Sequence, residues 1–125
     1  MARKLRNVSL YINDILDSIR KIELYISGKD FIQFRKDSLT VDAVVRNFEI
    51  IGEAANQLPK SFKDSNKDIE WKYLIEFRNV IIHEYFGINY EIIWDIIQNE
   101  LQPLNSKISE LQDKLINTQI PLEWD

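Results

Sequence analysis

Apolar residues recur every three or four positions through most of this chain, and this spacing predicts helices. The clearest case is the segment 4–27, where valine, tyrosine and isoleucine side chains fall on one helical face. They are Val8, Tyr11, Ile12, Ile15, Ile19, Ile22 and Ile26. No stretch shows the apolar–polar alternation of a half-buried strand. The sequence therefore predicts an all-α fold, with Gly28 as the C-cap candidate of the first helix.

The next part of the chain predicts a short helical turn and a second long helix. The turn is expected at 30–34, and Thr40 is a candidate N-cap for the long helix. This helix runs to about Leu58, because Pro59 cannot continue it. Residues 60–67 are rich in serine, lysine, aspartate and asparagine, so they predict a polar loop.

The remaining helices are predicted by their caps and breakers. Asp68 is a candidate N-cap for a helix that runs to about Tyr85, before Gly87. Asn89 is a candidate N-cap for the helix directly after it, and Pro103 either kinks that helix or starts another. The sum is an up-and-down bundle of four to five main helices.

The composition limits the class of protein. With 125 residues the chain is expected to form a single domain, and no apolar run approaches the roughly 18 residues of a membrane span. The first residues lack the apolar core of a signal peptide, so we expect a cytoplasmic protein without a membrane partner. Cysteine is absent and there is one histidine, which excludes thiolate and two-histidine metal sites. No cofactor is predicted.

The charge balance argues against nucleic acid at first sight. Sixteen basic and twenty acidic residues give a net charge of −4, which repels a polyanion at long range. Binding depends on the local field, however, and a dimer can bring cations from two chains into one groove. RNA therefore stays a candidate partner.

Residues 78–85 hold the only histidine beside a cation, an amide and a phenol. On a helical wheel with about 100° per residue, Arg78 lies in the middle of an apolar stripe. The stripe consists of Trp71, Leu74, Ile75, Ile82 and Tyr85. Because a buried unpaired guanidinium is unfavourable, we expect Arg78 to face a cleft, a carboxylate or a phosphate. A separate polar stripe holds Lys72, Glu76, Asn79 and His83, so His83 is expected to be solvent-accessible.

The second long helix carries its own stripe of charge. Asp42, Arg46, Glu49 and Glu53 follow one another at helical spacing. Two interpretations stay open, namely a solvated face with intrahelical ion pairs and a wall of the cleft that Arg78 faces. A magnesium site built from Glu49 and Glu53 is a further alternative. The residues alone also allow an ion pair between Arg78 and Glu49.

The segment from Arg78 to Tyr85 resembles the Arg-x4-His-x-Tyr signature of HEPN ribonuclease toxins of the HepT type. All three positions match, and the resemblance extends to residues 42–54 before the signature and to Trp71 and Trp94 on either side of it. It covers roughly residues 5–115, which implies one HEPN-like helical domain over 1–125 with a polar C-terminal tail. The resemblance implies an RNA substrate.

Arginine and histidine also suit RNA cleavage on chemical grounds. RNA carries its own nucleophile, the 2′-hydroxyl, so cleavage needs a base, an acid and a cation for the phosphorane, and no metal. Histidine titrates in the right range and arginine keeps its charge. On a continuous helix Arg78 and His83 lie about 140° apart, so one chain brings them together poorly. A second protomer would solve this.

The family resemblance assigns roles to these residues. It implies a homodimer in which His83 is the acid or base, Arg78 binds the phosphate and Asn79 assists. It also implies that Tyr85, otherwise a core aromatic, accepts AMP from a cognate minimal nucleotidyltransferase antitoxin. Asp42, Arg46 and Glu49 become candidate cleft-wall residues. The alternative is a non-catalytic HEPN helper that binds a nucleotidyltransferase or a nucleotide.

Overall fold

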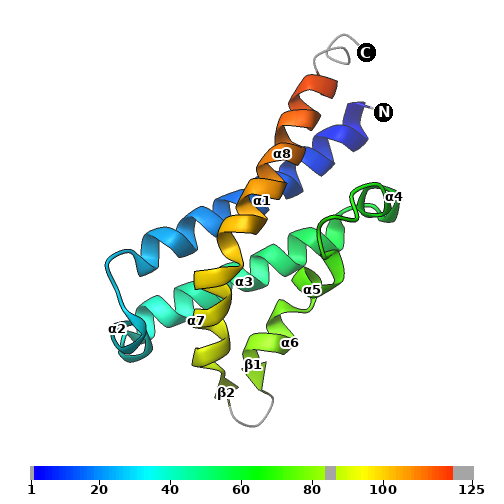
Figure 1. Cartoon of the computed structure of the whole chain (residues 1–125). Helices are drawn as coiled ribbons and strands as arrows, with labels where there is room; N and C mark the ends of the chain where they lie inside the picture. Colours follow the sequence, from blue (N-terminus) through cyan, green and yellow to red (C-terminus); the bar gives the residue numbers. More distant parts are fainter. Residues whose placement is uncertain (1, 84–86, 120–125) are drawn as a thin grey trace.

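The computed structural model describes the backbone of residues 2–83 and 87–119, and the side chains of residues 7–82 and 87–117. This part of the chain is almost entirely helical (Figure 1). The helices are α1 (Ala2–Ile26), α2 (Phe31–Lys36), α3 (Ser38–Gln57), α4 (Lys60–Asp64), α5 (Trp71–Ile75), α6 (Phe77–Ile81), α7 (Tyr90–Asn99) and α8 (Leu101–Gln119). Two-residue strands, β1 (Ile82–His83) and β2 (Gly87–Ile88), pair between α6 and α7. The prediction of an all-α bundle is confirmed.

The centre of the bundle is the antiparallel pair α1 and α3, which lie side by side in Figure 1. The isoleucines predicted to line one face of α1 are buried, and they pack in one core with the apolar face of α3. The buried residues of the two helices include Val8, Ile12, Ile15, Ile19, Ile22, Val41, Val44, Phe48, Ile51 and Ala55. Each large apolar side chain buried in this way contributes roughly 1.5–3 kcal/mol. Hydrophobic burial therefore holds α1 and α3 together.

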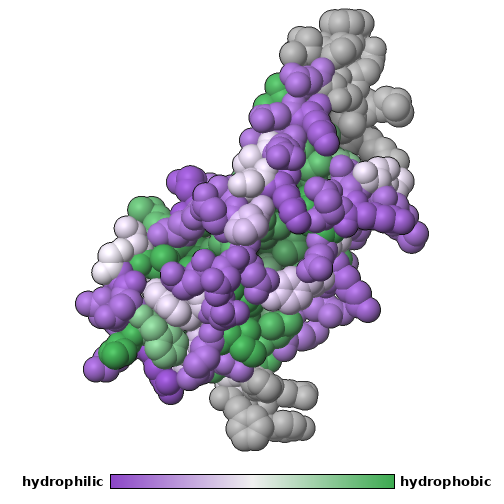
Figure 2. Space-filling view, in the orientation of Figure 1, coloured by the Kyte–Doolittle hydropathy of each residue, from purple (hydrophilic) through white to green (hydrophobic). Residues whose placement is uncertain are grey.

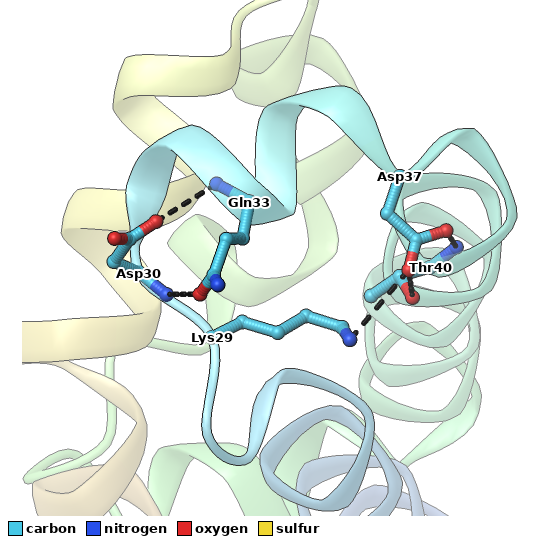
Figure 3. A network of polar contacts seen from close by, with 5 residues as sticks. All are labelled: Lys29, Asp30, Gln33, Asp37 and Thr40. Carbon is cyan, nitrogen blue, oxygen red and sulfur yellow. Dashed lines mark hydrogen bonds and ion pairs between the residues drawn. The ribbon is translucent and has the colours of Figure 1, made fainter.

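Short-range polar contacts fix the turn from α1 to α3 (Figure 3). Asp30 and Gln33 form a capping box at the start of α2, in which each side chain accepts a hydrogen bond from the other's backbone N–H. The predicted cap of α3 at Thr40 is wrong: Asp37 is the N-cap, and its carboxylate accepts from the hydroxyl and N–H of Thr40. These two bonds and the Lys29 ammonium lower the pKa of the Asp37 carboxyl. The acidic residue occupies the cap because α3 begins three residues earlier than predicted.

The C-terminal half follows the predictions made from Asn89 and Pro103. The Asn89 side chain accepts from the N–H of Ile92 and caps α7. Helix α7 ends at Asn99, and a separate helix, α8, begins at Leu101 with Pro103 in its first turn. Helix α8 packs on α1 and completes the bundle. None of the helices in the described ranges has an apolar stretch of the length that membrane crossing demands.

Two local predictions for the middle of the chain are wrong. The polar segment 60–67 was expected to be a loop, yet it contains the helix α4. The helix expected from Asp68 to Tyr85 is divided into α5 and α6 and ends at Ile81, while Asp68 caps neither of them. The run Val80–Ile82 is β-branched, which lowers helix propensity and favours an extended backbone. Pairing of His83 with Gly87, which has a positive φ of 76°, then forms the short ladder.

Candidate functional site

Arg78 lies on α6 at the surface and pairs with a carboxylate of α3. Its side chain is 66% exposed, and its Nε is 3.3 Å from Oε2 of Glu49, which is 28% exposed. Arg78 thus faces a carboxylate, which is one of the three surroundings expected for it. Ion pairs this exposed are worth about 0–1 kcal/mol, so a phosphate can replace Glu49 at low cost. The guanidinium is thus positioned but remains available to a ligand.

A hollow of about 220 Å³ adjoins this ion pair between α3 and the α5–α6 segment. Its described lining consists of Glu49, Gly52, Glu53, Asn56, Ile75 and Arg78. Gly52 allows the close approach of the two segments, because a Cβ there would lie 3.0 Å from the carbonyl oxygen of Leu74 and 3.2 Å from that of Ile75. We refer to this lining as the Arg78 hollow.

The charged stripe of α3 combines both predicted interpretations. Glu49 and Glu53 line the Arg78 hollow, whereas the described lining includes neither Asp42 nor Arg46. Arg46 instead forms an ion pair with Glu53 along the helix, with 3.2 Å between Nη1 and Oε1. The stripe is therefore a solvated face at Asp42 and Arg46 and a cleft wall at Glu49 and Glu53.

Each glutamate of the magnesium alternative already has an arginine partner, Arg78 for Glu49 and Arg46 for Glu53. Among residues 7–82 and 87–117, whose side chains the structure describes, no three histidine, cysteine or carboxylate groups lie close enough to share an ion. The two glutamates beside the Arg78 hollow are thus engaged in ion pairs with arginines. The described part of the chain offers them no third acidic or histidine ligand with which to hold a magnesium ion.

His83 occupies β1 and not a helix, which corrects the geometry expected for the signature. Ile82 has an extended backbone, with φ −118° and ψ 116°, and the carbonyl of Ile81 accepts from the N–H of Asn89 at 2.8 Å. The angle of about 140° that was expected between Arg78 and His83 presupposed a continuous helix, so it does not apply. The backbone of His83 is held by its antiparallel pairing with Gly87.

Of the other predicted site residues, the structure describes Asn79 in full, His83 by its backbone alone, and Tyr85 not at all. Asn79 is exposed on α6 directly after Arg78, as its place on the polar stripe predicted. The side chain of His83 and the whole of Tyr85 lie outside the described residues. The helix on which Tyr85 was expected to share a face with Arg78 ends at Ile81.

Sequence reasoning missed the part that Gly52 and its neighbours play in this site. Gly52, Asn56 and Ile75 line the Arg78 hollow, and only the closeness of α3 to α5 gives them that position. A signal was present in the sequence, since a glycine inside a long apolar helix is unfavourable unless packing requires it.

A separate hollow of about 340 Å³ lies between the α5–α6 segment and α7–α8. Its lining includes a hydrogen bond of 3.3 Å from the Tyr73 hydroxyl to Oε2 of Glu100. Burial, and then the negative charge of Glu100, raise the pKa of Tyr73 to about 12. Neither Arg78 nor Glu49 belongs to its described lining, so it is distinct from the Arg78 hollow.

Comparison with known proteins identifies the family. The model of the HepT-like ribonuclease family matches residues 15–111, which include the whole Arg-x4-His-x-Tyr signature. This chain belongs to the HepT-like ribonuclease family. No solved structure matches it.

Relatives from archaea and bacteria agree with this assignment. A protein of Methanocaldococcus jannaschii named as a candidate RNase is 39% identical over 85% of this chain and 88% of its own. A candidate RNase of Caldanaerobacter subterraneus is 38% identical over 83% of this chain and 93% of its own. A protein of Thermococcus cleftensis named as a probable ribonuclease HepT is 33% identical over 82% and 93%. The HepT-like protein described here covers most of each of them.

Proposed function

We propose that this HepT-like protein is a metal-independent endoribonuclease that acts in the cytoplasm as the toxin of a type II-like toxin–antitoxin system. The observation that carries the proposal is Arg78, an exposed cation held beside a hollow by a weak ion pair to Glu49. It begins the signature of a ribonuclease family, and a phosphodiester is the ligand that a guanidinium of this kind binds well.

In the proposed reaction the RNA supplies its own nucleophile. A base removes the proton of the 2′-hydroxyl, whose oxygen forms a bond to the adjacent phosphorus while the bond from phosphorus to the 5′-oxygen breaks. An acid gives a proton to that leaving oxygen, so the products are a 2′,3′-cyclic phosphate and a 5′-hydroxyl. His83 serves as acid or base, Arg78 stabilises the extra negative charge of the phosphorane, and Asn79 assists.

The proposed active form is a homodimer with the two signatures facing one cleft. Arg78 and His83 occupy different elements, α6 and β1, and a second copy can supply the complementary acid or base. Light scattering should report about twice the chain mass of 14.9 kDa. A monomer at micromolar concentration that still cleaves RNA would exclude the shared cleft.

Single substitutions test the nuclease itself. His83→Ala and Arg78→Ala should abolish RNA cleavage with the helical circular dichroism spectrum retained, and EDTA should leave the wild-type rate unchanged. Arg20→Ala is a matched control, because Arg20 is also exposed, at 67%, and ion-paired with an acidic residue, Asp17. Its cleavage rate should equal that of the wild type. Activity that disappears in EDTA and returns with magnesium would refute the metal-independent mechanism.

The proposed regulation is the addition of AMP to Tyr85 by a cognate nucleotidyltransferase antitoxin. A tethered phosphodiester brings negative charge and bulk close to a site that must bind RNA phosphate, so cleavage should fall. Intact-mass spectrometry after co-expression with the nucleotidyltransferase should show adenylyl increments on the wild type. Tyr85→Phe should lose the increments and keep its activity, and increments that persist in this variant would refute the assignment.

The acidic charge of the chain favours one alternative, a non-catalytic helper that binds the nucleotidyltransferase or a nucleotide. A net charge of −4 is easier to reconcile with a protein partner than with RNA. The two functions differ in one assay. A helper leaves RNA intact whether His83 is present or replaced by alanine, whereas the nuclease requires it.

A further inference from the structure

A third hollow, of about 390 Å³, lies against α4 and α5 and is rich in lysine. Its charged lining consists of Lys60, Lys63, Asp64, Lys67, Glu70 and Lys72. Four lysines against two carboxylates make this a positive region on a chain whose net charge is −4. We refer to this lining as the lysine hollow. The corner of the molecule at α4 is covered by hydrophilic residues (Figure 2).

The lysine hollow adjoins the Arg78 hollow. Ile75 lines both of them. In addition, the Lys63 ammonium donates a hydrogen bond of 3.2 Å to the carbonyl of Ala55, and the next residue, Asn56, lines the Arg78 hollow. A ligand that leaves the Arg78 hollow past Ile75 therefore arrives among the lysines.

Contacts with Trp71 fix α4 and the turn after it, which carry three of these lysines. The indole N–H of Trp71 donates to the carbonyl of Asn66 at 3.0 Å, and the Asn66 amide donates to the carbonyl of Phe62 at 2.8 Å. The rings of Phe62 and Trp71 lie 6.1 Å apart, and Trp71 is 7% exposed. The lysines are thus presented by an ordered surface, which lowers the entropy lost on binding.

Two of the four lysines hold neither an ion pair nor a hydrogen bond within the described part of the chain. Lys60 pairs with Asp64 at 2.9 Å, and Lys63 is engaged with the carbonyl of Ala55. Lys67 and Lys72 are exposed and form no ion pair with the residues that the structure describes. These two are the cations of the lysine hollow that are available to an anion.

We propose that the lysine hollow binds backbone phosphates of the RNA next to the phosphate held by Arg78. The inference rests on the proposed ribonuclease function and extends it to the way the substrate is held. Lysine contacts phosphate as a point charge regardless of the base, so this subsite would add affinity without sequence preference. It also answers the charge objection, because the cations are gathered where the polymer passes.

The test is the double variant Lys67→Ala/Lys72→Ala against Lys21→Ala/Lys36→Ala. The control also removes two lysine charges, one from α1 and one from α2. Helix α2 lies at the opposite end of α3 from α4 (Figure 1). The probe is a fluorescent 12-nucleotide 2′-O-methyl oligouridylate, which cannot be cleaved by 2′-hydroxyl attack. Fluorescence anisotropy gives Kd at 0.1 M and 0.3 M salt.

The expected loss follows from counterion release. For single strands the logarithm of the binding constant falls by about 0.7 per phosphate contact and per decade of salt, so two contacts contribute a slope of about 1.4. If affinities coincide at 1 M salt, the double variant binds about 25-fold more weakly than the wild type at 0.1 M and about 5-fold at 0.3 M. The double variant should also have a lower kcat/KM for RNA cleavage than the wild type. The control variant should match the wild type in both Kd and kcat/KM.

The outcomes separate the two proposals. A double variant that binds the oligomer like the control, while the wild type cleaves RNA, refutes the lysine subsite and leaves the nuclease standing. A double variant that loses binding to the nucleotidyltransferase but not to the oligomer shows that the hollow serves a protein partner, which also refutes it. A wild type that neither binds the oligomer nor cleaves RNA refutes both the lysine subsite and the ribonuclease function.

Discussion

Gly52→Ala tests whether the close contact between α3 and α5 determines the position of Arg78. The new Cβ would lie 3.0 Å and 3.2 Å from two carbonyl oxygens, so the neighbouring backbone must move by a few tenths of an ångström. Overpacking of this kind costs about 1–3 kcal/mol, and alanine in a helix recovers about 1 kcal/mol relative to glycine. The net destabilisation is therefore about 1 kcal/mol.

Two measurements follow from this estimate. The urea midpoint should fall by about 0.3–1 M, given a dependence of about 1–3 kcal/mol per molar. Arg78 belongs to the segment that moves, and a misplacement of about 1 Å costs roughly 100-fold in rate, so a few tenths should lower kcat/KM about 4- to 10-fold.

Gly28→Ala provides the control for lost stability alone. Gly28 has a φ of 76° and open space around its Cα, so alanine there costs about 1 kcal/mol through backbone strain and touches nothing near Arg78. Its activity at temperatures below unfolding should equal that of the wild type. A Gly52→Ala protein that is as stable and as active as the wild type would refute the reasoning.

Three further predictions concern stability. Phe77→Ala should cost about 3–5 kcal/mol in urea unfolding, because Phe77 is 1% exposed and its ring packs edge-on against Phe48 at 5.1 Å; Phe77→Leu should cost clearly less. Asp37→Ala should lower the melting temperature at neutral pH, and since the folded pKa of Asp37 lies below 3.8, the difference should vanish as pH falls through it. Tyr73 has a folded pKa of about 12 against an ordinary value of 10.0, so the wild type should lose stability relative to Tyr73→Phe as pH rises from about 10 to 12, and parallel pH curves would contradict this.

The long helices could be predicted because their signal is local. The isoleucines of α1 recur at the helical period, and the same residues form the core. Asn89 was recognised as a cap because its side chain bonds only three residues onward. The cap of α3 was placed wrongly because Asp37 and Thr40 are both good capping residues, and the choice depends on where the preceding turn delivers the chain.

Only the features of the site that depend on a single pair of residues could be predicted from the sequence. An ion pair between Arg78 and Glu49 was one of the interpretations that the residues allowed, and the structure shows this pair at the surface. The end of α6 at Ile81 was missed because it depends on pairing of β1 with β2, which competes with the helical pattern. The lysine hollow was missed because it requires α4, Trp71 and the end of α3 to meet in space.

The arginine of the family signature lies on a helix and the backbone of its histidine lies in a strand, so these two residues have separate supports. The backbone at Arg78 belongs to α6, which packs on α3, while the backbone at His83 is held by its pairing with Gly87. Substitutions on α3 should therefore disturb the proposed phosphate-binding residue, and substitutions at Gly87 the proposed acid–base residue. Affinity for RNA and the ability to cut it are then two traits that mutation can change one at a time.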